Sequence, residues 1–282
     1  CAIAEKTWHE VGGEAPVYVI GTEVPVPGGA QEGLDSLEVT SVEAASETIQ
    51  VHYDAFMGKG LKNAWQRIIG LVVQPGVEFD HHKIIPFQPA KAQALSQYIE
   101  SNRQMVFEAH STDYQSTAHL SALVDGHFAI LKVGPWLTFA LREAIWALDA
   151  IEQEWIAPEL RSNVKAILLQ AMNDNPVYWK KYYSTEPKQQ ALDCQYSLSD
   201  RIRYYWPVPA VEAALNILID NLNRTPPPLT LLSQYMPAQY QAVMDNTLSM
   251  NVRELIFHKI SRVLEQYSIA CNKTVEAVNK DI

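Results

Sequence analysis

The chain has few cysteines and no paired cysteine motif. Cys1, Cys194 and Cys271 are widely spaced and form no C-x-x-C pair, which argues against a disulfide framework and a structural zinc site. This usage fits a reducing compartment, so we expect a cytoplasmic protein. No apolar run approaches the roughly 20 residues needed to cross a bilayer, so we expect no membrane partner.

Basic charge and glycine-rich motifs are also scarce. Lys and Arg total 22 against 32 Asp and Glu, which gives a formal net charge of -10. An acidic protein repels phosphate backbones, so nucleic acid is not expected as a partner, although a local group of donors could still hold one small phosphate. No G-x-G-x-x-G motif follows an expected strand, which disfavours a dinucleotide-binding fold.

The N-terminal segment resembles neither a signal peptide nor a usual start. Residue 1 is Cys, and CAIAEKT lacks the basic and apolar regions of a secretory signal. The segment is typical of the end of an amphipathic helix. We therefore expect a piece of a longer chain, with a processed mature protein as the alternative.

What the sequence does contain, in its first half, is a regular alternation of strands and helices. Near-continuous apolar runs predict buried parallel strands at 16–21, 67–73, 105–110 and 128–134. Helical periodicity predicts helices at 42–60, 89–102, 116–126 and 138–157. Four βα units indicate an α/β fold with a parallel sheet, either an open doubly wound sheet or half of a (β/α)8 barrel.

The second half is predicted to be helical. Amphipathic patterns cover 162–174, 211–224 and 252–272, and aromatic-rich irregular stretches lie between them. We expect two regions, a barrel-like region at 1–157 and a helical extension at 158–282.

Polar side chains gather where the expected strands end. Because side chains alternate along a strand, Glu108 and His110 share one face of the third strand. Glu23 lies just beyond the first strand, in line with one of its faces, and Lys132 lies on one face of the fourth strand. We predict Glu108 and Lys132 as catalytic groups. Glu23 and His110 are predicted ligands of a divalent metal, zinc or magnesium. The alternative is a structural ion pair between Glu108 and Lys132.

Five further residues are predicted to bind substrate. Gln74, Ser111 and Asp113 follow the second and third strands, and Arg201 and Arg203 could clamp a phosphate. For the two arginines, ordinary salt bridges are the competing interpretation.

Several long strings resemble one family. They are GTEVPVPGG (21–29), VVQPGVEFDH (72–81), EAHSTDYQ (108–115), ILKVGP (130–135), TFALREAIWAL (138–148), YWKKYY (178–183) and YSLSDRIRYYWP (196–207). They are similar to segments of the GatZ/KbaZ-like proteins, the Z subunits of class II tagatose-1,6-bisphosphate aldolase. The resemblance implies an aldolase-type TIM barrel with a helical C-terminal extension. By this resemblance, the chain is expected to hold the last four βα units of that barrel.

The resemblance also implies a role beside another protein. The implied partner is a separate class II aldolase catalytic subunit, which the Z subunit stabilises and brings to full activity, and the implied small molecules are ketose phosphates. A metal-dependent sugar-phosphate 4-epimerase, interconverting fructose 6-phosphate and tagatose 6-phosphate, is the enzymatic alternative. A truncated copy without function is the third hypothesis. The sequence offers no P-loop for a kinase.

Overall fold

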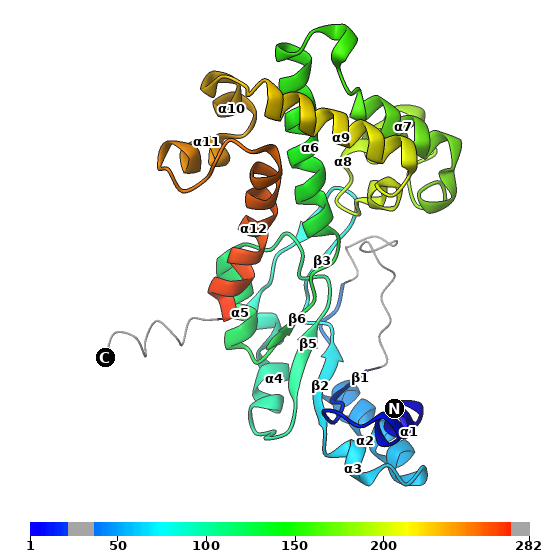
Figure 1. Ribbon diagram of the computed structural model, residues 1–282. Helices are drawn as coiled ribbons and strands as arrows, with labels where there is room; N and C mark the ends of the chain where they lie inside the picture. Colours follow the sequence, from blue (N-terminus) through cyan, green and yellow to red (C-terminus); the bar gives the residue numbers. More distant parts are fainter. Residues whose placement is uncertain (22–36, 272–282) are drawn as a thin grey trace. The chain divides into compact units, whose positions relative to one another are not determined.

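The computed structural model describes residues 1–21 and 37–271 (Figure 1). The chain forms two compact units. Unit 1 contains Cys1–Gly134 and the chain from Gln266 onward, and unit 2 contains Pro135–Glu265. The sequence prediction placed the division after Ala157. The structure places it earlier because the long helix α6 (Pro135–Trp155) buries Ile145 and Leu148 in the helical core of unit 2.

Unit 1 is built on a four-stranded parallel sheet with the order β1-β2-β5-β6. Each predicted strand is present but shorter than expected. The sheet strands are β1 (Tyr18–Ile20), β2 (Ile68–Val73), β5 (Val106–Ala109) and β6 (Ile130–Leu131). A two-stranded antiparallel hairpin, β3 (Glu78–Phe79) with β4 (Ile84–Ile85), follows β2 and was not predicted.

The helices of unit 1 begin where capping chemistry allows. Ser41 and Ser116 accept hydrogen bonds from main-chain amides of the first turns of α2 and α5, and Pro89 occupies the first turn of α4. The helices, all labelled in Figure 1, are α1 (Ala2–Val11), α2 (Val42–Gly58), α3 (Lys62–Trp65), α4 (Pro89–Glu100) and α5 (Thr117–Asp125). The last residues of α12 (Val252–Cys271) also belong to this unit.

The two faces of the parallel sheet differ in burial. One face carries Leu71, Phe107 and Ala109, which are fully buried in one core with apolar residues of α2, α4 and α5. The register places Val19 and Glu108 on the opposite face, where Val19 is 38% exposed. The sheet therefore packs helices on one side and leaves the face that carries Glu108 partly open.

Unit 2 is helical, as the sequence predicted. Its described residues, 135–265, contain no strand. The helices are α6, α7 (Val164–Asp174), α8 (Pro187–Tyr196), α9 (Pro209–Arg224), α10 (Leu229–Tyr235), α11 (Pro237–Met244) and most of α12, with three 3-10 turns, η2 (Pro158–Leu160), η3 (Pro176–Tyr178) and η4 (Arg201–Tyr205). Leu218 and Leu222 of α9 pack with Leu255 of α12 in its core. Along the described residues of both units, no helix has the length and apolarity required to cross a membrane.

Candidate functional site at the carboxyl end of the parallel sheet

The ends of β5 and β6 bring three predicted residues together. Glu108 accepts from His110 Nε2 at 2.8 Å and from Lys132 Nζ at 3.3 Å, both through its Oε1 atom. The parallel register aligns Glu108 with Ile130, and side-chain alternation then directs Lys132 to the same face. The convergence predicted from strand parity is thus present, while the chemical roles of the three groups stay predictions.

Burial within this cluster is unequal. Glu108 is 5% exposed, whereas the Lys132 side chain is 57% exposed. A buried carboxylate needs a partner, and Glu108 has two, the His110 ring and the Lys132 ammonium. The ion pair thus joins a buried carboxylate to a Lys132 side chain that is more than half exposed, an arrangement compatible with a structural pair as well as with a binding site.

His110 is held by one of its two ring nitrogens. With the proton on Nε2, the ring donates to Glu108, and Nδ1 then carries the lone pair. Nδ1 is buried and has no hydrogen-bond partner among the described residues. A carboxylate that fixes the tautomer in this way orients the other nitrogen to accept a proton or to ligate a metal.

The loop after β5 is anchored at several points. Thr112 Oγ1 donates to the carbonyl of Lys132 at 2.7 Å, and Asp113 Oδ1 accepts from the amide of Gly134 at 2.8 Å. Ser111 between this anchor and His110 has a left-handed backbone, with φ of 54°. Such backbone strain is found preferentially at functional sites. Asp113 is 2% exposed, and its bond to Gly134 holds the loop in place. Substrate binding by Asp113 stays a prediction.

Tyr267 is a residue of this loop anchor that sequence reasoning missed. It lies on α12, and its hydroxyl donates to the carbonyl of Thr112 at 3.0 Å. Burial raises the pKa of the Tyr267 phenol, so it remains a neutral donor. The two residues are 155 positions apart, and no local pattern could have linked them.

Two other predictions for this site have different outcomes. Gln74 lies after β2, but its side-chain oxygen accepts from the amides of Gly76 at 2.8 Å and Val77 at 3.0 Å. That oxygen therefore stabilises the turn, and substrate binding by Gln74 stays a prediction. Glu23, predicted as a metal ligand, lies outside the described residues.

The predicted metal site is incomplete within the part of the chain that the structure describes. There, no group of three His, Cys, Asp or Glu side chains is arranged to hold a metal ion. His110 Nδ1 has the right chemistry for one ligand. Zinc or magnesium therefore stays a prediction that needs at least two more ligands.

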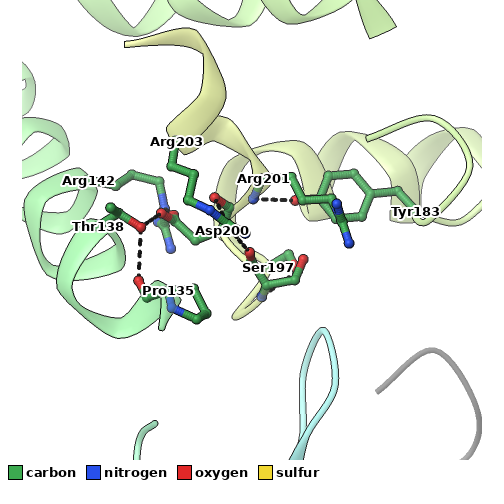
Figure 2. A network of polar contacts seen from close by, with 9 residues as sticks. Pro135, Thr138, Arg142, Tyr183, Ser197, Asp200, Arg201 and Arg203 are labelled. Carbon is green, nitrogen blue, oxygen red and sulfur yellow. Dashed lines mark hydrogen bonds and ion pairs between the residues drawn. The ribbon is translucent and has the colours of Figure 1, made fainter. Parts of the chain in front are cut away.

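Arg201 and Arg203 belong to unit 2, in a polar network around Asp200 (Figure 2). Arg201 is 3% exposed, donates through Nη1 to the carbonyl of Tyr178 at 3.2 Å, and lies over the ring of Tyr182. Burial lowers the pKa of the Arg201 guanidinium. Arg203 donates to the carbonyls of Ser199 and Asp200. Both guanidinium groups thus have protein partners, and phosphate binding by either one stays a prediction.

Comparison with known proteins now defines the family. The model of the D-tagatose-1,6-bisphosphate aldolase subunit GatZ/KbaZ-like family matches residues 1–272. The chain belongs to this family. The resemblance stated from the sequence is therefore confirmed across both units.

Individual relatives agree with the family match. The D-tagatose-1,6-bisphosphate aldolase subunit GatZ of Shigella flexneri serotype 5b (strain 8401) is 51% identical over 271 residues, covering 96% of this chain and 64% of the relative. The subunit of the same name from Escherichia coli O8 (strain IAI1) matches with the same identity and coverage. The chain thus spans less than two thirds of the length of these relatives.

A solved structure supports the fold. The crystal structure of a probable tagatose 6 phosphate kinase from Sinorhizobium meliloti 1021 has a TM-score of 0.83 and 42% sequence identity. The match covers 91% of this chain and 63% of that one. It supports a mixed α/β fold that is mostly helical and contains a parallel sheet.

Proposed function

We propose that this chain is the C-terminal part of an accessory subunit of tagatose-1,6-bisphosphate aldolase. The observation that carries the proposal is the family match over residues 1–272, together with relatives that bear the subunit name at 51% identity. In this role the protein binds a class II aldolase catalytic subunit and increases its stability and activity. The pathway served is the breakdown of tagatose 6-phosphate, galactitol or amino sugars in the cytoplasm.

The proposed fold of the complete subunit is an aldolase-type TIM barrel with a helical extension. Four sequential parallel strands, each followed by helical structure, are half of the eight units of such a barrel. The half-open sheet face that carries Val19 and Glu108 would become the barrel interior. The chain spans only 64% of its relatives, which leaves room for the other four units.

The proposed ligand of the polar cluster is a ketose phosphate. Barrel enzymes bind substrates at the carboxyl ends of their strands, where Glu108, His110 and Lys132 lie. Lys132 would attract the phosphate or a substrate oxygen, and Glu108 would bind sugar hydroxyls. A divalent metal would polarise a substrate oxygen, held by His110 Nδ1 and Glu23 with further ligands.

A second candidate function is a metal-dependent 4-epimerase acting on fructose 6-phosphate and tagatose 6-phosphate. The observation favouring it is the pairing of buried Glu108 with His110, whose Nδ1 has no partner among the described residues. A carboxylate–imidazole pair beside an ammonium can transfer protons to and from a polyol. An accessory subunit has no need of such a pair, although it can retain one.

One set of assays separates the two candidates. The complete polypeptide encoded by the gene is mixed with a class II aldolase catalytic subunit, and tagatose 1,6-bisphosphate cleavage and its thermal half-life are measured. Higher activity and a longer half-life in the mixture support the accessory role, and unchanged values refute it. The polypeptide alone is incubated with fructose 6-phosphate. Chelator-sensitive formation of tagatose 6-phosphate would instead establish the epimerase.

A further inference from the structure

A pair of stacked tyrosines is exposed on unit 2. Tyr178 of η3 and Tyr204 of η4 have ring centroids 4.9 Å apart and nearly parallel rings, at 27°. They are 43% and 38% exposed, and Val177 beside them is 61% exposed. Their neighbours in the sequence, Trp179 and Tyr205, are buried and fill the core. The exposed aromatics are therefore additional to those that hold the fold together.

Cationic side chains lie next to this tyrosine pair in space or in the sequence. The Arg203 guanidinium lies over the Tyr204 ring at 4.5 Å. The exposed Lys180 and Lys181 line a shallow depression of about 360 Å³ together with Val177. We call this surface the aromatic–basic patch, and it consists of Val177, Tyr178, Lys180, Lys181, Arg203 and Tyr204.

The patch is positive in a strongly negative protein. Three of its six residues are Lys or Arg and none is Asp or Glu, although the chain carries a net charge of -10. Tyr182, next to Lys181 in the sequence, is also affected by positive charge. A hydrogen bond from Lys181, aided by the charge of Arg201, lowers the pKa of the Tyr182 phenol.

The two tyrosines and Arg203 are residue types that are enriched at protein interfaces. Tyr and Arg are enriched at interfaces and dominate their binding energy, because rigid aromatic area is buried at little entropic cost. We propose that the aromatic–basic patch is the surface through which this protein docks an acidic surface of a partner protein. The inference rests on the proposed function, in which the partner is the aldolase catalytic subunit.

Two other occupants fit the patch less well. A nucleic acid would meet the repulsion of the net charge of -10. A second copy in a symmetric dimer would place the patch against itself and oppose the same cations across the two-fold axis. An acidic face on a different protein satisfies both the cations and the tyrosines.

The test compares two double variants of the complete polypeptide in binding to a class II aldolase catalytic subunit. Lys180→Glu with Lys181→Glu reverses the charge, and we expect association to slow by about tenfold or more at low salt, with a loss of salt dependence. Tyr178→Ala with Tyr204→Ala removes the aromatic pair, and we expect Kd to rise by about tenfold or more. Circular dichroism and thermal unfolding verify that both variants fold.

The matched control is Arg253→Glu with Arg262→Glu, which makes the same change in charge at exposed positions of α12. Full binding by the control and weakened binding by both patch variants support the inference. If wild type binds and the patch variants bind equally well, the patch assignment is wrong and the accessory role stands. If wild type does not bind, both are wrong. If the variants instead lose self-association, the patch belongs to a second copy and the inference is overturned.

Discussion

Replacing Asp200 with asparagine would remove one charge from a buried ion pair and change little else. Asp200 Oδ1 accepts from Arg142 Nε at 2.9 Å, and its Oδ2 accepts from Thr138 Oγ1 at 2.6 Å (Figure 2). The two charged side chains are 0% and 3% exposed. Asp200 has a left-handed backbone, with φ of 46°, which asparagine also adopts readily.

The expected cost follows from the charge left behind. Removal of one partner leaves the Arg142 guanidinium uncompensated in the interior, which typically costs about 3–5 kcal/mol. The asparagine oxygen can still accept from Arg142, so we expect the lower value, about 3 kcal/mol for Asp200→Asn. With a urea m-value of about 1–3 kcal/mol/M, the unfolding midpoint should fall by about 1–3 M.

The assay is urea unfolding followed by tryptophan fluorescence, because Trp146 and Trp206 lie in unit 2 and contact each other. A thermodynamic cycle with Arg142→Met supplies the control. If the charges interact directly, Asp200→Asn combined with Arg142→Met should cost clearly less than the sum of the single changes. A loss below about 1 kcal/mol for Asp200→Asn, or strictly additive effects, would refute the reasoning.

Three further outcomes are expected. Glu108→Gln should abolish ketose phosphate binding in calorimetry while circular dichroism stays unchanged, because a neutral amide cannot form the ion pair that holds the Lys132 ammonium. Wild-type affinity in this variant would remove Glu108 from the site. Burial raises the pKa of the Cys194 thiol to about 11, so at pH 8 only about one Cys194 side chain in a thousand is a thiolate. Ellman's reagent should therefore modify the exposed Cys1 and Cys271 far faster than Cys194, and equal rates for the three cysteines would contradict this. Tyr267→Phe should lower the free energy of unfolding by about 1 kcal/mol, because the hydrogen bond from the Tyr267 hydroxyl to the Thr112 carbonyl is lost. An unchanged melting temperature would mean that this hydrogen bond does not stabilise the fold.

The regular elements of unit 1 could be predicted because their signals are local. A buried parallel strand is a continuous apolar run, and β2 and β5 were found within one residue at each end. Pro89 and Gly126 marked a helix start and a helix stop that the structure confirms. The β3–β4 hairpin was missed, since two-residue strands show no periodicity.

The division into units could not be read from local patterns. The helix α6 follows directly on β6, and sequence alone assigned it to the last βα unit. Its buried residues instead pack against α7, α9 and α10, which come later in the chain. Which partner a helix chooses depends on tertiary contacts, and an amphipathic pattern specifies only that a partner exists.

The predictions for site residues separate according to how firmly the backbone directs each side chain. Glu108, His110 and Lys132 lie on or next to strands, where side chains alternate and the register fixes neighbours, so parity alone was enough to bring them together. Arg201 and Arg203 lie in a 3-10 turn, and only their charge suggested a ligand. This turn is five residues long, too short for its three-residue period to tell an inward from an outward side chain in the sequence. Carbonyl groups of the protein supplied the acceptors that a phosphate would have offered. A functional prediction from sequence is therefore strongest where regular structure dictates direction, and for this chain that place is the carboxyl end of β5 and β6.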